Sequence, residues 1–464
     1  LRTVQAGVDM LARQPGGSLA IRGGIYRETV NLDALRGQPG AGFRIHRYGG
    51  ERVTISAAEV LTGWQPCPED EAATLGLPVN AEVWVVRVDR DQLEHGAVTA
   101  LNLHEAGEWR SIATDRADLT RLETPGDFRS FHEAEFVLDA KDNILAIRHP
   151  RLKGIPTAWM AQVQVLVYHA PNAVSTDPGA GFDPSTGTLL LSDQTRRVQR
   201  AGKVPQMLYS LQNYGPALRP GQWIAHDEGK EIAVYLQPDN PANLGQGVEI
   251  SLRPVCIDLG NATHVELAGI EAVRASGEDR LSGICIRRKG GGEPGEGFTL
   301  TQCRAGENHT VSGRGYGAIY LRGALGVTIH NCSVGPARNA FGLFLSDCQD
   351  ADLRLLHISG VSKSPARFYG LKRAVLAFSL FEDSAYDAHA NKFNFYEGSD
   401  AVLVYGVRCR EVGGYATYQE ASRIHFAFCE INCAPLSQNR ALVSQNRGAG
   451  DGQGGSDGSG DPVA

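Results

Sequence analysis

One short strand-like pattern recurs between residues 256 and 433 and constrains the fold more than any other feature. Each copy carries apolar residues at its first, third and sixth positions, and copies begin every 22 to 33 residues. A period of this size is typical of solenoids. Because no helical pattern separates the copies, each fits one coil of a β-helix, which buries its inner face only by stacking on the next coil.

Three columns of inward side chains are therefore predicted. The first positions are Val265, Phe298, Val327, Leu353, Val375, Val402 and Ile424. The third positions are Leu267, Leu300, Ile329, Leu355, Ala377, Val404 and Phe426, and the sixth are Ile270, Cys303, Cys332, Ile358, Leu380, Val407 and Cys429. Cysteines in such a column are interpreted as small buried hydrophobes. The sequence has nine cysteines and no CxxC pair, so a metal site built on cysteines is not predicted.

A second strand precedes each copy and alternates inward and outward side chains. Phe368, Phe395 and Thr417 are predicted to face inward. The outward residues next to them form one column of Tyr369, Tyr396 and Tyr418 and another of Arg367, Asn394 and Ala416. Since neighbouring coils lie about 4.8 Å apart, the three tyrosines are predicted to form an exposed aromatic ladder.

The rest of the chain divides by pattern. Residues 1–58 contain a short amphipathic helix over 4–13, which caps the open end, and the first coils. Residues 59–254 lose the coil rhythm, contain all five tryptophans and read as a mostly β insertion domain with the tryptophans in its core. Residues 255–436 are the remaining coils, and the Gly-, Ser- and Asp-rich residues 437–464 are predicted to be a flexible tail.

Composition excludes several classes of function. The formal net charge is −7, without the basic surface of a nucleic-acid-binding protein. No apolar stretch is long enough to span a membrane. The chain begins at Leu1 without a signal-peptide pattern, which leaves a removed leader and an excerpted chain as alternatives.

Several motifs resemble pectin-lyase-like β-helix proteins, in particular bacterial members that carry an insertion. Residues 23–29 (GGIYRET), 51–56 (ERVTIS) and 63–64 (GW) resemble their opening coil. Residues 211–213 (LQN) through 220–223 (PGQW) resemble the point of return to the helix, and residues 389–391 (HAN) through 396–398 (YEG) resemble a coil motif. The resemblance implies an all-β, single-stranded right-handed parallel β-helix. The superfamily includes lyases, hydrolases, epimerases and adhesive proteins, so it does not fix the reaction.

The densest polar cluster lies at residues 381–397 and is our candidate catalytic region. It supplies Asp387, His389, Lys392, Tyr396 and Glu397. We expect Arg322, Arg367, Tyr369, Asn394 and Tyr418 to bind substrate. The alternative interpretation is a polar surface turn in which Asp and Asn serve turn geometry.

Two chemistries compete for this cluster. A lyase needs a cation for the uronate carboxylate, a base and an acid. Lys392, Arg367 or Arg322 would hold the carboxylate, His389 or Lys392 would be the base, and Tyr396 the acid. A glycoside hydrolase needs two carboxylates at a defined spacing. Asp387 with Glu397 is the preferred pair, with Glu382, Asp383 and Glu420 as substitutes.

A second cluster lies on a long connection between coils and could line the same groove. It contains Glu307, Asn308, His309, Arg314 and Tyr316. The resulting hypothesis is a secreted, periplasmic or cell-surface enzyme that degrades a polysaccharide, with a lyase slightly favoured over a hydrolase. The rival is a non-catalytic, carbohydrate-binding or adhesive β-helix. No metal or cofactor is predicted, although calcium is possible for a lyase, and the sequence makes no prediction of oligomeric state.

Overall fold

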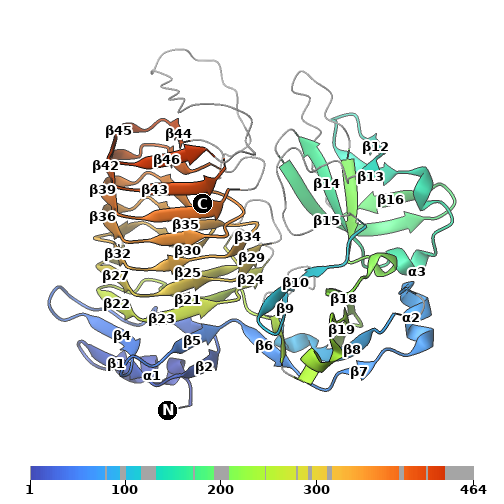
Figure 1. The fold of residues 1–464 in the computed structure, drawn as a ribbon, viewed down its shortest axis with the longest axis horizontal. Helices are drawn as coiled ribbons and strands as arrows, with labels where there is room; N and C mark the ends of the chain where they lie inside the picture. Colours follow the sequence, from blue (N-terminus) through green and yellow to red (C-terminus); the bar gives the residue numbers. More distant parts are fainter. Residues whose placement is uncertain are drawn as a thin grey trace.

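The computed structural model describes residues 2–78, 81–94, 101–115, 132–170, 173–192, 208–245, 247–277, 281–290, 295–310, 316–385, 391–413 and 416–433. Two bodies lie side by side in Figure 1: a stack of coils and, beside it, a domain built from residues between β5 and β21. The stack consists of three long parallel sheets, so the prediction of a parallel β-helix is confirmed.

Sheet 1 contains β1 (Gly17–Ile21), β4 (Phe43–Arg47), β22 (Val265–Ala268), β27 (Phe298–Thr301), β32 (Thr328–His330), β36 (Gln349–Arg354), β39 (Lys372–Ala377), β42 (Asp400–Tyr405) and β45 (Ser422–Ala427), with the short β26 (Gly295–Glu296) and β31 (Ala324–Leu325) beside this path. Sheet 2 contains β2 (Gly24–Arg27), β5 (Val53–Ser56), β23 (Ile270–Val273), β28 (Arg304–Gly306), β33 (Ser333–Val334), β37 (His357–Ser359), β40 (Leu380–Ser384), β43 (Arg408–Val412) and β46 (Glu430–Cys433).

Sheet 3 contains β3 (Val30–Asn31), β21 (Val255–Asp258), β25 (Ile284–Arg288), β30 (Gly317–Arg322), β35 (Phe341–Ser346), β38 (Ala366–Tyr369), β41 (Phe393–Tyr396) and β44 (Ala416–Gln419). A small corner sheet of β24 (Ser276–Gly277), β29 (Asn308–Thr310) and β34 (Ala337–Arg338) lies between sheets 2 and 3 along the chain. Each full coil therefore runs from sheet 3 to sheet 1, turns into sheet 2 and returns.

The N-terminal helix α1 (Val4–Leu11) packs on the first coil. Val4, Val8 and Leu11 are buried, as the amphipathic pattern predicts for a helix that closes an exposed sheet end. The Thr3 hydroxyl accepts a hydrogen bond from the backbone N–H of Ala6 (3.2 Å), which caps its first turn.

The domain beside the stack leaves the β-helix after β5, where sheet 2 would lead to sheet 3, and rejoins it at β21. One sheet, mostly antiparallel, contains β6 (Ala58–Leu61), β20 (Val248–Ser251), β9 (Leu103–Glu105), β10 (Glu108–Ile112), β18 (Gln222–Asp227), β19 (Glu231–Gln237), β8 (Trp84–Asp89) and β7 (Gln65–Pro66). The other contains β11 (His132–Glu133), β17 (Leu208–Gln212), β14 (Gln164–Ala170), β15 (Ala173–Asp183), β16 (Thr188–Leu191), β13 (Ile144–Arg148) and β12 (Glu135–Leu138), and the helices are α2 (Glu69–Leu75) and α3 (Thr157–Met160).

The inward columns were predicted correctly at the first coils and wrongly at two later ones. Val265 pairs with Phe298, and Leu300 with Ile329, as expected. Ile329 then pairs with Leu353, two residues earlier than the predicted Leu355, which is 56% exposed. In the next coil the inward residues are Ala374 and Leu376, one residue before the predicted Val375 and Ala377.

Small residues fill inward positions in these two coils, and an apolar pattern does not single them out: Ala351, Ala374 and Ser379 are all buried. The corner before these strands is not different, because a residue with positive φ precedes the first inward residue in every coil from His264 (+51°) to Arg423 (+49°), Asp350 (+54°) and Arg373 (+52°) included. The prediction is displaced by two residues at β36, which keeps the same face, and by one residue at β39, which moves every side chain to the other face. The cysteine prediction is less sensitive to this: Cys303 and Cys332 are buried and free.

Candidate functional site

The outward face of sheet 3 carries two adjacent columns of side chains over the coils of β30 to β41. One column consists of Tyr320, Phe344, Arg367 and Asn394, and the other of Arg322, Ser346, Tyr369 and Tyr396. Each residue pairs in register with the next, so the columns follow directly from parallel stacking of one coil on another. Most of the residues predicted to bind substrate lie on this face.

Arg367 is the centre of an aromatic cluster on this face. Its Cζ lies 4.5 Å from the ring centre of Phe341, 4.8 Å from that of Tyr369, and 5.3 and 5.5 Å from those of Phe344 and Tyr396. Its Nη2 donates a hydrogen bond to the Tyr369 hydroxyl. Because a guanidinium is planar and weakly hydrated, it stacks on aromatic faces while keeping its charge. The cluster thus holds a cation in a fixed position.

The rings form a continuous path across the coils. Tyr316 stacks on Tyr320 with ring centres 4.3 Å apart, and Phe344 lies 5.6 Å from Tyr369. Tyr320 and Phe344 are buried, whereas Tyr316, Tyr369 and Tyr396 are half-buried. Burial raises the pKa of the Tyr320 phenol. Tyr320 and Phe344 therefore support the face, and the half-buried tyrosines and Arg367 can present polar groups from it.

The tyrosine ladder is shorter than predicted. Tyr369 and Tyr396 pair in register with ring centres 5.1 Å apart, as expected. Tyr418 pairs with Phe395 instead, and Gln419 takes the place beside Tyr396. The connection from sheet 3 to sheet 1 is one residue shorter in the last coil, which moves the register by one.

Two predicted site residues lie in buried positions. Asn394 lies in the outward column beside Arg367 but is only 2% exposed, and it accepts a hydrogen bond from the Ser364 hydroxyl (3.4 Å). Lys392 is also 2% exposed, and its charge acts on the interior Cys409, partly opposing the burial that raises the pKa of that thiol to about 12. Neither residue is presented to solvent.

Other predicted residues are distributed as follows. Arg322 lies in the column of Tyr369, is exposed, and has its Nε 3.7 Å from the Asp347 carboxylate. Glu382 and Asp383 lie on sheet 2, where Glu382 makes a 2.6 Å contact with His357 Nε2. Asp387, His389 and Arg314 lie outside the described residues.

An acidic column lies at the end of sheet 3, where the chain turns toward sheet 1. Asp347, Gly370, Glu397 and Glu420 hold equivalent places in four successive coils, with φ between +46° and +55°. Glu397 and Glu420 are exposed and stand in adjacent coils, joined by the hydrogen bond from Gly398 N–H to the Glu420 carbonyl (2.9 Å). Their backbones are thus about 4.8 Å apart.

The second predicted cluster lies partly at the junction with the insertion domain. His309 on β29 pairs with Arg338 on β34, whose Cζ lies 3.5 Å from the ring centre of Trp109 on β10. Glu307 is bound by Arg274 and Arg304; burial would raise its pKa, but these two cations outweigh burial and lower it. Tyr316 instead belongs to the aromatic face of sheet 3.

Sequence reasoning missed Tyr320, Phe344 and Arg338. Tyr320 and Phe344 stand between inward apolar residues of their strands, so the alternation that identified Arg367 would have found them if it had been extended back by two coils. Arg338 has no such signal, because its partner Trp109 lies in the insertion domain, far away in the sequence.

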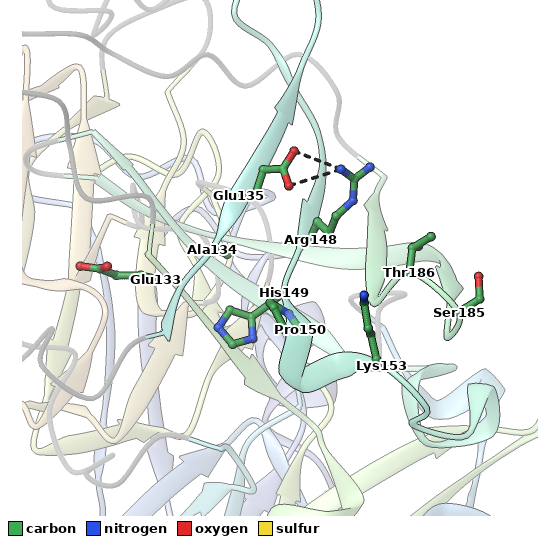
Figure 2. A pocket seen from close by; sticks show the side chains of 9 residues that line it. All are labelled: Glu133, Ala134, Glu135, Arg148, His149, Pro150, Lys153, Ser185 and Thr186. Carbon is green, nitrogen blue, oxygen red and sulfur yellow. Dashed lines mark hydrogen bonds and ion pairs between the residues drawn. The ribbon is translucent and has the colours of Figure 1, made fainter.

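A pocket of about 630 Å³ opens in the insertion domain, away from sheet 3. Figure 2 shows Glu135 and Arg148 paired side by side on β12 and β13 in its lining, with Nη1 to Oε1 at 3.0 Å, and His149, Lys153 and Thr186 in the rest of the lining. Its walls mix both signs of charge and carry no aromatic platform apart from the His149 ring. Among the described residues, no group of three or more His, Cys, Asp or Glu side chains is arranged to hold a metal ion.

Comparison with known proteins supports the fold but does not identify a reaction or a substrate. No protein-family model matches the chain, and no curated protein matches its sequence. A solved structure described as a glycoside hydrolase is similar at 12% identity with a TM-score of 0.53, over 92% of this chain and 93% of that one. Such coverage must include most of the insertion domain, so the likeness extends to both bodies.

Two further solved structures are similar at lower scores. The complex of XylC with xylose has 10% identity and a TM-score of 0.48, covering 93% of this chain and 66% of that one. The tailspike protein gp49 from Pseudomonas phage LKA1 has 9% identity and a TM-score of 0.29. This chain spans about half of that protein (51%).

Proposed function

We propose that this protein degrades a glycan bound across the outward face of sheet 3, and that it acts as a lyase on a uronic-acid sugar. The observation that carries the proposal is the Arg367 guanidinium held among Phe341, Phe344, Tyr369 and Tyr396. Aromatic rings suit the C–H faces of sugar rings, and a fixed guanidinium suits a carboxylate.

In the proposed reaction each residue has a defined task. Arg367 neutralises the uronate carboxylate, which makes the adjacent C–H proton easier to remove. A base takes that proton, the bond to the leaving glycosidic oxygen breaks, and a double bond forms in the sugar. The Tyr396 hydroxyl protonates the leaving oxygen. His389 remains the candidate base from the sequence.

A glycoside hydrolase is the second candidate, and the acidic column supports it. Glu397 and Glu420 stand one coil apart, close to the spacing of about 5–5.5 Å between the carboxyl groups of retaining enzymes. Asp347 is two coils from Glu397, near the upper end of the inverting range of about 6.5–9.5 Å. A similar solved structure is also described as a glycoside hydrolase.

Four single variants separate the two reactions. With polygalacturonate or alginate as substrate, we expect Arg367→Lys and Tyr396→Phe to lower kcat/KM by at least tenfold, because Lys cannot replace the stacked fork and Phe cannot donate a proton. Glu397→Gln and Glu420→Gln are then matched controls with little effect. The reverse ranking, with loss only in the two glutamine variants, would reject the lyase and support the hydrolase.

The proposed substrate also implies where the protein works. Extended polysaccharides of this kind are met outside the cytoplasm, so we propose a secreted, periplasmic or cell-surface location. None of the described helices is both long and apolar enough to cross a membrane.

A further inference from the structure

The corner between sheets 1 and 2 is made by one residue per coil in a left-handed conformation. Gly269, Gln302, Asn331, Leu355, Phe378, Gly406 and Phe428 fill this place in successive coils, with φ between +51° and +68°. Glycine and asparagine are the residues that tolerate this conformation, whereas bulky side chains are disfavoured in it. Phenylalanine is therefore an unexpected choice at two of these seven corners.

The two phenylalanines are also exposed. Phe378 is 54% and Phe428 is 84% exposed, and Leu355 in the coil before Phe378 is 56% exposed. Neither ring contributes to the interior of the stack. The fold requires only a turn at this position, which Asn331 and Gly406 make without a bulky side chain, so conformational strain and solvent exposure both oppose phenylalanine here.

The exposed rings form an ordered array with Tyr405 between them. Ring centres are 5.3 Å apart from Phe378 to Tyr405 and 5.3 Å apart from Tyr405 to Phe428, at interplanar angles of 83° and 66°. Gly406 makes room for this packing, because a Cβ there would stand 3.2 Å from the Phe378 ring. We call Phe378, Tyr405 and Phe428 the corner ladder.

Polar groups flank the corner ladder on sheet 2. Arg408 and Glu430, each two residues beyond its corner residue, pair in register and stand 3.6 Å apart from Arg408 Nε to Glu430 Oε2. Their side chains are 62% and 53% exposed. Apolar rings at one-coil intervals beside charged hydrogen-bonding groups match a sugar polymer, which presents C–H faces and hydroxyl edges in alternation.

The size of the corner ladder argues against a second copy of the chain as its occupant. Even at about 200 Å² for each whole aromatic side chain, three rings offer at most about 600 Å². Each partner in a standard protein interface buries about 800 Å². A narrow ligand that runs along the stack fits the array better.

We propose that the corner ladder is a second glycan-binding surface, separate from the outward face of sheet 3. The choice of ligand class rests on the proposed function. In this role the ladder holds a distant part of the same polymer, so that a long chain binds more tightly than a short one by being held at two places.

The test uses Phe378→Asn combined with Phe428→Asn, because asparagine keeps a residue suited to the turn, as at Asn331, while both rings are removed. Tyr48→Ala is the matched control, since Tyr48 is a 52% exposed aromatic residue outside the corner ladder. Binding is measured by electrophoresis of the full chain in gels containing xylan, polygalacturonate or alginate. Thermal melting checks that the double variant is folded.

We expect the double variant to melt at a temperature no lower than that of the unmodified protein. Its affinity for a polymer that the unmodified protein binds should fall at least fivefold, whereas the affinity of Tyr48→Ala should not fall. Unchanged binding, or binding of none of the three polymers by the unmodified protein, would overturn the proposal. So would a dimer in sedimentation that the double variant dissociates. If the double variant binds as well as the unmodified protein and both release reducing ends at the same rate, the ladder proposal fails while the proposed function stands. If the double variant loses binding but the unmodified protein cleaves none of the polymers, the ladder proposal stands while the proposed function fails.

Discussion

At the scale of single residues, burial divides the phenylalanines into two groups with opposite roles. Phe395 is fully buried, and its ring centre lies 5.3 Å from that of Phe368 in the coil before. Truncating such a residue removes buried apolar surface and leaves a cavity, so Phe395→Ala should lower the free energy of unfolding by about 3–5 kcal/mol. Phe378→Ala, at the exposed corner, should change it by well under 1 kcal/mol. Urea denaturation of both variants checks this, and equal losses would contradict the assignment.

His104 gives a prediction for pH dependence. It is 2% exposed on β9, and burial with the nearby Arg274 lowers its pKa to about 3. The unfolded chain therefore binds a proton below about pH 6.5 that the folded chain does not bind. The free energy of unfolding should fall as pH drops from 6.5 toward 3, by about 1 kcal/mol per pH unit from this residue, and should not depend on it above pH 6.5.

The variant His104→Gln cannot be protonated and should show a shallower loss of stability in acid. Urea denaturation at pH 7 and pH 5 measures the difference between the two slopes. His425→Gln serves as the control for the substitution itself, because His425 is exposed on β45. A slope for His104→Gln equal to that of the unmodified protein would show that His104 titrates normally in the folded state.

At the scale of elements, the corner sheet is where the two bodies are joined. The Arg338 guanidinium stacks on Trp109, and burial lowers its pKa to about 10. Arg274 and Arg27 of the β-helix also form ion pairs with Glu249 on β20. The junction is therefore held by desolvated cations, and uncharged residues of similar size could not make the same ion pairs and cation–π contact.

A double-mutant cycle tests this contact. Arg338→Met and Trp109→Leu should each destabilise the protein, and together by less than the sum, with a coupling of about 0.5–2 kcal/mol. Arg354→Met, combined with Trp109→Leu, is the control, since Arg354 is exposed on sheet 1 and bound to Asp352. Additive effects for Arg338 and Trp109 would show that the stacked pair contributes nothing to the junction.

The strand registers show which parts of the β-helix could be predicted from the sequence. Columns such as Leu267, Leu300 and Ile329 could be predicted, because inward apolar residues repeat wherever coils have the same internal spacing. The columns through Leu355, Val375 and Tyr418 could not, because the small residues Ala351, Ala374 and Ser379 fill inward positions and a shortened turn moves the place of Tyr418 by one residue.

At the scale of the whole molecule, the parallel β-helix could be predicted and the site only in part. Arg367, Tyr369 and Tyr396 meet on one face as expected, since Arg367 and Tyr369 lie two residues apart on β38 and Tyr396 pairs with Tyr369 in the next coil. The burial of Lys392 and Asn394 could not be read from the sequence, because both belong to strand and turn positions that look exposed by polarity alone. The junction contacts depend on the insertion domain and have no local signal.

The most direct test of the central claim is incubation of the unmodified protein with xylan, polygalacturonate and alginate, following new reducing ends and the ultraviolet absorbance of unsaturated uronates together. We expect both signals to rise with a uronic-acid polymer. Reducing ends without absorbance would move the assignment to a hydrolase built on Glu397 and Glu420. Neither signal from any polymer, with binding retained, would contradict the claim that this β-helix degrades the glycan it binds.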